Sequence, residues 1–441
     1  MLTVSPYSAR QTAPPPAPEV LLAQVLLGNG IRSVYQPIVC LDDGEVVAYE
    51  ALARGPRGTR LEAPDVLFAV ARDSGLLAEL EWSCRTAALE GALEAALPAS
   101  SALFMNVEPG LLGLPAPASH LRILGEARRR LRVIVEITER AITHRPTDLL
   151  RALDEAREHG WGIALDDVGA NPESLALLPL IHPDVIKLDM ALVQGAPSRA
   201  TAQVLSAVLA EAERTGATIL AEGIETLEHV ETALALGATL GQGWFYGRPG
   251  PLPTVVPRSD LGLRLLPRAS RASLPTPYDV VSAAISVRRG RRDLLLAISM
   301  HFEHQASAMG DTPVVLGAFQ TADRFTRATA TRYARLAAKS SLVAALAHGL
   351  SAEPAPGVRG ASLDPGDPLL NEWSVVVLGP HYAGALVARD LGDGGPEAQR
   401  RFDFAITHDR ALVIAAAASL MAKIAPRAHP VSAEAVKLRS T

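Results

Sequence analysis

Acidic and amide side chains recur along the first 250 residues, and each stands at or just after the end of a short apolar run. The series comprises Glu50, Asn106, Glu136, the adjacent pair Asp166–Asp167, Lys187 with Asp189, Glu222 with Glu225, and Gln242. If these strand ends lie close together, the carboxylates would repel one another and raise one another's pKa values. A multivalent cation would relieve that repulsion. Because the candidate ligands (Glu50, Asn106, Glu136, Asp166, Asp167 and Glu222) all offer oxygen, they favour Mg²⁺ or Mn²⁺ over zinc or copper.

The pair Asp166–Asp167 suits a carboxylate that bridges two metal ions. Two ions about 3.5–4 Å apart clamp the attacking and leaving oxygens of an in-line displacement at phosphorus. Lys187, placed among the acids, could orient or deprotonate the attacking water. Gln36 and Arg54 could contact a phosphate or a base. Together these residues predict metal-dependent cleavage of a phosphate ester.

Each of these signals is weak when taken singly. An isolated Asp-Asp or Lys-x-Asp is usually a solvated turn, and an Asn after a strand is commonly a turn former. The informative feature is the ordered series at successive strand ends.

The elements that must position these residues alternate between short apolar runs and longer helix-like segments. The predicted strands are Ser33–Val39, Val46–Ala53, Ala102–Val107, Val133–Ile137, Gly162–Leu165, Asp184–Leu188 and Thr218–Ala221. Predicted helices between them include Pro64–Ser74, Leu80–Ala95, Asp148–His159 and Ala200–Thr215. Repeated alternation of this kind predicts an α/β fold, a TIM-like (β/α)8 barrel whose active site lies at the carboxyl ends of its strands. The short turn at Asp42–Gly44 leaves no room for a crossover helix, so one strand is expected to run antiparallel.

The second half predicts a smaller α/β domain. A proline-rich stretch precedes it, and expected strands at Leu294–Ser299, Pro313–Phe319, Trp373–Leu378 and Phe402–Ile406 alternate with helices at Ala322–Leu350 and Arg410–Ala422. The predicted organisation is a flexible lead (1–19), the barrel (20–255), a linker (256–277), the second domain (278–427) and a tail (428–441).

Composition and charge narrow the class of protein. The 441 residues are 48% apolar and 20% charged with a net charge of −5, which is typical of a globular chain. No basic field points to duplex nucleic acid or to a membrane surface. The longest apolar stretch, Ala411–Met421, falls short of the roughly 20 residues that span a bilayer. Cys40 and Cys84 give neither a zinc spacing nor a disulfide framework, which fits the reducing cytoplasm.

The ordered motifs of residues 20–255 resemble the EAL domain, a family that hydrolyses cyclic-di-GMP to linear pGpG. The motifs are Tyr35–Gln36–Pro37–Ile38, Glu50–Ala51–Leu52–Ala53–Arg54, Asn106, Glu136–Ile137–Thr138–Glu139, Asp166–Asp167, Lys187–Leu188–Asp189, Ala221–Glu222–Gly223–Ile224–Glu225 and Gln242–Gly243.

The resemblance implies a role for each matching residue. Glu50, Asn106, Glu136 and Asp166 would bind a first ion, Mg²⁺ or Mn²⁺, and Asp166, Asp167 and Glu222 would bind a second. Lys187 would act on the nucleophilic water, and Glu139 would brace the loop after the fifth strand. Contacts to the dinucleotide would come from Gln36, Leu52, Arg54 and Gln242, with Asp189 and Glu225 as supporting acids nearby.

One segment departs from the family pattern. After Asp166–Asp167 the family usually continues Phe-Gly-Thr/Ala-Gly, whereas this chain reads Val168–Gly169–Ala170–Asn171–Pro172–Glu173–Ser174. In the family this loop helps to order the second metal and the dimer interface. The loss of a glycine and the gain of Pro172 stiffen it. The departure bears on the rate, on regulation and on a homodimer formed through the barrel, and it removes no metal ligand.

The second half resembles the DICT domain, a sensory module that accompanies cyclic-di-GMP enzymes and two-component systems. The supporting stretches are Val375–Tyr382, Leu386–Leu391 and Arg401–Asp409. The signal or protein partner of this module is left open. His381, His408 and Asp409 are interpreted as capping or packing residues. The chain lacks a Gly-Gly-Asp/Glu-Glu-Phe cyclase signature, so synthesis of cyclic-di-GMP is not expected.

Two other functions remain open at this point. The barrel could be a receptor that binds cyclic-di-GMP without cleaving it, although such receptors typically lose the EAL glutamate, a metal ligand or the lysine. The chain could also be chiefly a sensor-adaptor that uses the barrel as its output.

Overall fold

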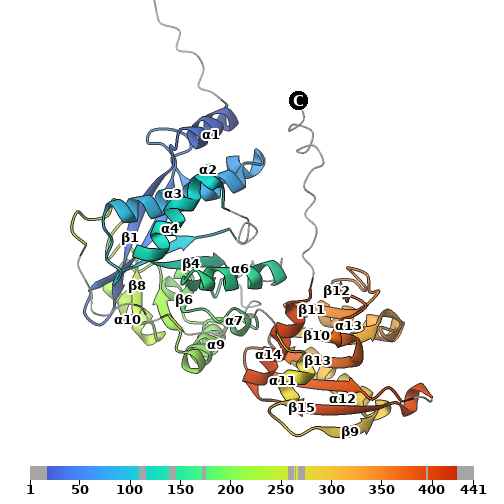
Figure 1. Ribbon diagram of the computed structural model, residues 1–441. Coiled ribbons are helices and arrows are strands. Elements are labelled where there is room, and N and C mark those ends of the chain that lie inside the picture. Colours follow the sequence, from blue (N-terminus) through green and yellow to red (C-terminus); the bar gives the residue numbers. More distant parts are fainter. Residues whose placement is uncertain are drawn as a thin grey trace, which may run out of the picture.

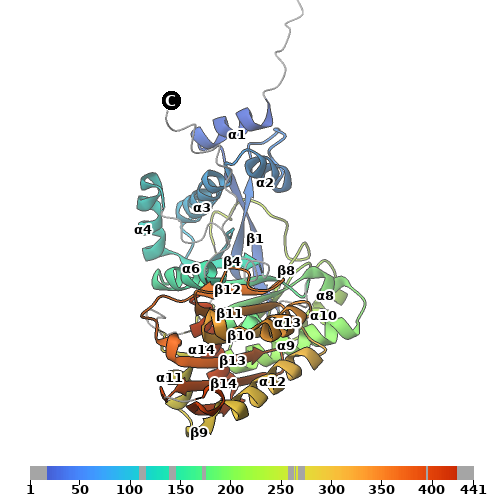
Figure 2. The same ribbon diagram turned by 90° about the vertical axis from the view of Figure 1, so that its right-hand side faces the viewer.

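The structure, a computed structural model, describes residues 17–108, 116–138, 146–170, 175–256, 263, 265–266, 274–393 and 396–424. Eight strands close into a barrel, and a separate seven-stranded sheet forms the second half (Figures 1 and 2). No helix among the described residues is long and apolar enough to span a membrane.

The barrel contains the seven strands expected from the sequence and an eighth that the sequence did not reveal. They are β1 (Arg32–Cys40), β2 (Val46–Arg54), β3 (Ala102–Asn106), β4 (Arg132–Thr138), β5 (Gly162–Val168), β6 (Val185–Leu188), β7 (Thr218–Ala221) and β8 (Leu240–Gln242). Strand β1 pairs antiparallel with both β2 and β8, while the remaining neighbours are parallel. The antiparallel strand predicted from the short opening turn is therefore confirmed.

Helices follow most of the barrel strands and lie on its outside (Figure 1). They are α1 (Pro18–Leu27), α2 (Pro64–Asp73), α3 (Leu77–Glu94), α4 (Leu121–Arg130), α6 (Pro146–Glu158), α7 (Leu178–Ile181), α8 (Met190–Gln194), α9 (Arg199–Thr215) and α10 (Leu227–Ala235). Local chemistry sets their ends. At α9, for example, the Ser198 side chain accepts a hydrogen bond from the Thr201 amide, and Gly216 ends the helix at φ 80°.

Part of the predicted linker belongs to the barrel. Leu263 is 7% exposed and packs, with Leu265 beside it, into the apolar core inside the barrel. Its carbonyl accepts a hydrogen bond from Arg132 Nη1 at 2.6 Å, and the Leu266 amide donates to Asp184 Oδ1 at 2.7 Å. The segment predicted as the linker 256–277 therefore packs against the barrel at these residues, and the linker assignment itself stays a prediction. Helix α1 likewise begins at Pro18, inside the predicted 1–19 lead. The other domain boundaries stay predictions.

The C-terminal sheet has the strand order β12-β11-β10-β13-β14-β15-β9. Its strands are β9 (Arg288–Arg291), β10 (Val314–Thr321), β11 (Leu342–His348), β12 (Arg359–Ser362), β13 (Glu372–Leu378), β14 (Ala383–Asp390) and β15 (Arg401–Thr407). Helices α11 (Pro277–Ser282) and α14 (Arg410–Met421) pack on one face, and α12 (Arg292–Ala308) and α13 (Arg327–Ala337) cover the other. A second α/β unit is thus present, as expected.

Two predicted elements in this half were wrong. Leu294–Ser299 lies in helix α12 and is no strand, and Ala322–Leu350 is not one helix but contains a 3-10 turn, α13 and strand β11. Short apolar runs such as Leu294–Ile298 fit a buried strand and a helix equally well, so periodicity alone cannot separate them. The capping interpretation near the sheet is confirmed, because the Asp409 side chain accepts from the Leu412 amide at the start of α14.

The two halves touch through the outer helices of the barrel. Helix α14 packs against α7, and the apolar core beneath α14 is continuous with that around the barrel. A polar contact joins Gln203 Nε2 on α9 to Asp311 Oδ1 at 3.4 Å. The helix that follows β5 therefore lies between the barrel and the C-terminal sheet.

Candidate active site

Strand periodicity explains why the predicted site residues meet. In a barrel, alternate residues of each strand point inward. The interior core contains Ile38, Ala48, Phe104, Ile134, Ala164, Val185, Leu220 and Leu240. The polar residues stand two positions further toward the same end of the barrel: Gln36, Glu50, Asn106, Glu136, Asp166, Lys187, Glu222 and Gln242. They therefore form one polar layer above an apolar one.

Strand register reinforces this layer. Gln36 pairs with Glu50 across β1 and β2, and Asn106 pairs with Glu136 across β3 and β4. Asn106 Nδ2 donates to Glu50 Oε1 at 2.8 Å, and Gln242 Nε2 donates to Glu50 Oε2 at 2.6 Å. Gln242 Nε2 also reaches Gln36 Oε1 at 3.2 Å. Glu50, only 6% exposed, is thus held by side chains from two other strands, β3 and β8.

Lys187 lies at the centre of the carboxylates, and it is 1% exposed. Its Nζ is 2.5 Å from Glu136 Oε1, 2.7 Å from Glu222 Oε1 and 3.0 Å from Asp166 Oδ1. Glu50 Oε1 lies further away, at 3.9 Å. One buried ammonium therefore faces four carboxylates, and Asp167 adds a fifth nearby. If all five acids were ionised, the one ammonium could balance only one of their negative charges.

Burial and mutual repulsion shift the acids unevenly. Burial, reinforced by the Glu50 and Asp166 carboxylates, raises the pKa of Glu136 well above its usual range. Burial likewise raises the pKa of Glu222 to about 7, even though Lys187 opposes the shift. Burial alone would lower the pKa of Lys187, but the surrounding carboxylates outweigh it and hold that pKa well above its ordinary value. Lys187 is therefore charged at neutral pH.

The donor set fits hard divalent cations. Ligand oxygens of Asp166, Asp167 and Glu222 all lie within 4.8 Å of one another, as a single ion requires. Glu50, Asn106, Glu136 and Asp166 offer a second all-oxygen group around the Lys187 ammonium. The excess negative charge and the absence of nitrogen or sulfur donors in this set favour Mg²⁺-like ions. Asp167 adopts φ 58°, an uncommon conformation for a non-glycine residue, within β5 at the register shift between Leu165 and Val168.

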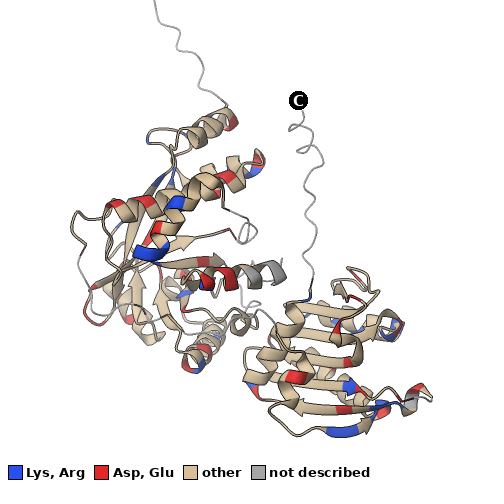
Figure 3. Ribbon diagram, in the orientation of Figure 1, with Lys and Arg blue, Asp and Glu red and all other residues tan. Residues whose placement is uncertain are grey.

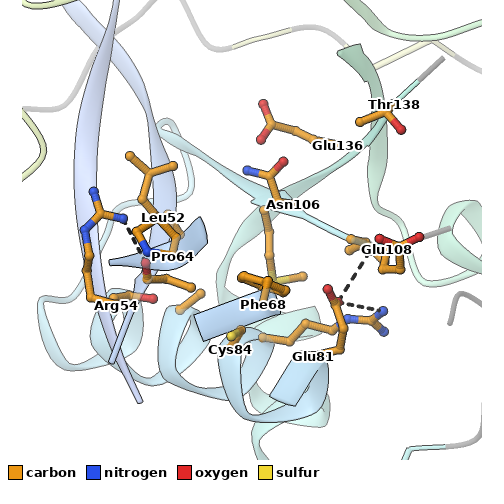
Figure 4. A pocket seen from close by; sticks show the side chains of 17 residues that line it. Leu52, Arg54, Pro64, Phe68, Glu81, Cys84, Asn106, Glu108, Glu136 and Thr138 are labelled. Atoms are coloured by element: carbon orange, nitrogen blue, oxygen red, sulfur yellow. Dashed lines mark hydrogen bonds and ion pairs between the residues drawn. The ribbon is translucent and has the colours of Figure 1, made fainter. Parts of the chain in front are cut away.

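A cavity of about 300 Å³ opens beside the acids, between the strand ends and helices α2 and α3. Its lining joins the expected substrate residues Leu52 and Arg54 to the expected metal ligands Asn106 and Glu136 (Figure 4). The Arg54 Nη1 atom is held by the Ala53 carbonyl at 2.8 Å. The two pairs of residues were predicted to have different roles, and the fold places them side by side in the lining of one cavity.

The same cavity contains residues that the sequence did not single out. Glu81 and Arg85 form a buried pair at 3.5 Å on α3, and Glu81 Oε2 also accepts from the Glu108 amide at 3.4 Å. Their spacing of four residues on a helix was a usable signal, but it is a common one. Only the packing of α3 against the barrel shows that the pair is buried.

The supporting acids lie outside the central group. The Asp189 side chain caps α8 by accepting from the Ala191 amide at 2.7 Å. Glu225 is exposed, and its amide donates to His229 Nδ1 at 3.2 Å. Glu139 lies outside the described residues, as do Asn171–Ser174 of the altered loop. Of that loop, Val168 is buried at the end of β5 and Gly169 has φ 106°.

Comparison with known families agrees with this geometry. The EAL domain matches residues 21–249, slightly more than half of the chain. The chain belongs to the EAL family. A second family, described as a sensory domain in diguanylate cyclases and two-component systems (DICT), matches residues 281–391. Both resemblances drawn from the sequence are confirmed.

Several curated relatives share the barrel. The chain is 32% identical to the cyclic di-GMP phosphodiesterase RocR of Pseudomonas aeruginosa over 257 residues, which cover 56% of the chain and 66% of RocR. It is 29% identical to the cyclic di-GMP phosphodiesterase NbdA of the same species, over 52% of the chain and 30% of NbdA. The chain thus corresponds to only part of these relatives. A solved complex of the PaMucR phosphodiesterase with c-di-GMP shows 26% identity and a TM-score of 0.46, covering 52% of this chain and 96% of that one.

Proposed function

We propose that the barrel hydrolyses cyclic-di-GMP to linear pGpG with the help of two divalent cations, Mg²⁺ or Mn²⁺. The observation that carries this proposal is the single inward layer in which four carboxylates surround the buried Lys187. Membership of the EAL family and the similarity to relatives named as cyclic di-GMP phosphodiesterases support the choice of substrate. We infer further that the barrel is a TIM-like (β/α)8 barrel of the EAL type.

Different residues of the chain would hold the two cations and orient the attacking water. Glu50, Asn106, Glu136 and Asp166 would hold one cation, and Asp166, Asp167 and Glu222 the other. Bound there, the cations would offset phosphate charge and acidify water. In the metal-free protein Lys187 is charged, so it can donate hydrogen bonds to the attacking water and orient it. This favours the orienting role over the deprotonating one.

Water attacks phosphorus, and the bond from phosphorus to the leaving ribose oxygen breaks, so one phosphodiester becomes a terminal phosphate and a hydroxyl. One of the carboxylates around Lys187 would take a proton from the water, and the leaving ribose oxygen would take up that proton or one from solvent, so that the protons balance. Leu52 and Arg54 border the adjoining cavity and would position the dinucleotide together with Gln36 and Gln242. Water is excluded from the lower barrel by the apolar layer beneath the acids.

Regulation by the C-terminal domain is part of the proposal. Helix α14 packs against α7, which follows the strand that carries Asp166 and Asp167. A change at the sheet could therefore reach the second cation site through one packed helix. A homodimer through the barrel and a cytoplasmic location stay predictions.

The decisive test is incubation of the purified chain with cyclic-di-GMP and Mg²⁺ or Mn²⁺, followed by chromatography of the products. Linear pGpG should form and should disappear with EDTA or in Glu50→Ala. Glu45→Ala, an exposed change in the same hairpin, is the matched control and should retain activity. If the chain instead bound cyclic-di-GMP tightly without metal and formed no product, it would be a receptor. The altered loop after Asp167 is the reason for considering this alternative.

A further inference from the structure

A second cavity, of about 250 Å³, lies within the C-terminal domain, between helices α12 and α13 and the ends of strands β10, β13 and β15. It lies on the opposite face of the sheet from α14 and the barrel. Its volume suits a small molecule. Its walls combine an aromatic part with a strongly basic part.

The aromatic part consists of Phe319, Trp373 and Phe402. The rings of Trp373 and Phe402 meet edge to face, with centroids 5.9 Å apart. The buried indole Nε1 of Trp373 has no hydrogen-bond partner among the described residues. A buried donor without a partner costs free energy, which an acceptor on a ligand would recover. This wall fits a flat apolar body.

The basic part gathers three arginines around one carboxylate. Glu397 Oε1 lies 3.1 Å from Arg292 Nε and 3.2 Å from Arg400 Nη1, and it also pairs with Arg324. The Glu397 side chain is 45% exposed, so solvent reaches it and screens these ion pairs. Figure 3 shows how basic residues gather at this β9 end of the sheet. Three guanidinium groups exceed what one exposed carboxylate satisfies.

Neighbouring acids do not remove this excess. Asp390 pairs with Arg400 from below, and it also accepts from Gln320 Nε2 at 3.2 Å. Asp323 lies 3.6 Å from Arg324 but is 76% exposed, so solvent screens it. Glu303 is engaged by Arg332 at 2.6 Å on the far wall. Glu397 and Asp390 offset two of the three positive charges of Arg292, Arg324 and Arg400, so the mouth of the cavity keeps one positive charge in excess, which the exposed Asp323 offsets only weakly.

Two backbone features point to the same place. Gln320 lines the cavity with φ 66° and 8% exposure, at a register shift of β10 between Ala318 and Thr321. Non-glycine residues in this conformation and strand irregularities concentrate at binding sites. Thr326 caps the 11-residue helix α13 at the cavity wall, so the positive end of that helix adds to the arginines.

We propose that this cavity is the ligand site of the C-terminal domain, and that it binds a small molecule with a flat aromatic body and one carboxylate or phosphate group. The aromatic body lies against Trp373 and Phe402. The anionic group replaces the Glu397 carboxylate between Arg292, Arg324 and Arg400. The proposal concerns this domain alone and does not depend on the activity of the barrel.

Calorimetric titration of the full chain in EDTA, which keeps cations from the barrel, tests the proposal with three probes of one shape. They are 1-naphthoate, 1-naphthyl phosphate and the neutral 1-naphthamide. At least one anion should bind saturably and about tenfold more tightly than the amide. Comparison of the two anions decides between carboxylate and phosphate.

Two variants move the affinity in opposite directions. Arg324→Gln should weaken binding of the preferred anion about tenfold, whereas Glu397→Gln should tighten it at least about twofold because the internal competitor is gone. Arg335→Gln, an exposed change on the same helix α13, should leave it unchanged. Since misfolding cannot increase affinity, the gain in Glu397→Gln keeps the test valid if Arg324→Gln folds poorly. The proposal would be overturned if the anions and the amide bound equally well or if neither anion bound saturably. It would also be overturned if neither Arg324→Gln nor Glu397→Gln changed the affinity for the preferred anion.

Discussion

At the residue scale, the unusual feature is a lysine that acts as an internal counterion. Lys187 is fully enclosed by acids from β2, β4, β5 and the end of β7. Buried ion pairs of this kind contribute little net stability, but removal of one partner leaves uncompensated charge. Under the proposed mechanism the same ammonium also orients the attacking water, so its effects on stability and on rate can be measured separately.

Lys187→Met should lower kcat by about 10²-fold or more, because the attacking water loses its orienting donor. In EDTA the variant should also lose about 3 kcal/mol in its free energy of unfolding, since the carboxylates then face no cation. Addition of Mn²⁺ should restore most of the stability and none of the rate. Lys339→Met, at an exposed lysine, provides the control. A variant with normal kcat would contradict the proposed role.

The metal-free protein should become less stable as the pH rises from about 6 to about 8. The folded-state pKa of Glu222 is about 7 against an ordinary 4.5, so its contribution to stability is complete only below about pH 4.5 and decreases as the pH rises to about 7; the range from pH 6 to 8 covers the last part of this decrease. The loss is about 1 kcal/mol, measurable by urea unfolding at each pH. With Mn²⁺ present the trend should vanish or reverse, because the cation binds the carboxylate form. A flat profile in EDTA would contradict the prediction.

At the element scale, the strand ends and one segment outside the strands position the site. Gly223 follows Glu222 with φ 70°, and a Cβ there would come within 2.4 Å of the Met190 Cβ. The turn after β7 and helix α8 are thus in direct contact. We expect this contact to hold the turn, and Glu222 with it, in place.

Gly223→Ala should destabilise the protein by about 2 kcal/mol and raise the Mn²⁺ concentration needed for half-maximal activity, because Glu222 must move. Gly44→Ala is a matched control: its φ is 75°, but no atom lies within 4 Å of the added Cβ. It should cost about 1 kcal/mol and leave the Mn²⁺ requirement unchanged. Equal Mn²⁺ requirements in both variants would show that the turn does not position Glu222.

The Leu263 segment should be part of the barrel's cooperative unit. Leu263→Ala removes an apolar side chain from the barrel interior and should lower the free energy of unfolding by roughly 3 kcal/mol. Val255→Ala, at a residue that is 80% exposed in the preceding segment, should change it by less than about 0.5 kcal/mol. Thermal and urea unfolding measure both. Similar changes in the free energy of unfolding in the two variants would show that the segment is a linker that does not stabilise the barrel.

At the scale of the whole molecule, the two halves are in contact through α7 and α14. Besides their apolar contact, Arg410 at the start of α14 interacts with Glu211 of α9, where burial raises the glutamate pKa. These contacts bring the C-terminal domain to the helices that follow β5 and β6. They do not cover the acid layer itself.

A fragment that ends after Leu274 keeps Leu263 and Leu265, which pack inside the barrel, but loses the C-terminal domain. It should need a higher Mn²⁺ concentration than the full chain for the same rate, by about threefold or more, because α7 loses its packing partner. A fragment that ends after Val256 also lacks Leu263 and should melt at a lower temperature. Identical Mn²⁺ curves for the full chain and the longer fragment would argue against intramolecular regulation.

The sequence by itself determined the barrel, its antiparallel strand and the members of the polar layer. It could do so because strands alternate with period two and because parallel strands end on one face, so residues such as Glu50, Glu136 and Lys187 had to converge. The EAL and DICT motifs placed both families before any geometry was known.

Only the tertiary structure decided what depends on contacts between distant segments. These include the caging of Lys187, the plug formed by Leu263, the burial of the Glu81–Arg85 pair and the arginine-rich cavity around Glu397. The same limit explains the errors at Leu294–Ser299 and at the segment that became β11, because an apolar run forms a strand or a helix according to the surface that it packs against. The period of the sequence pattern determines which face of a strand or helix a residue lies on. Tertiary packing determines which other residues that face contacts.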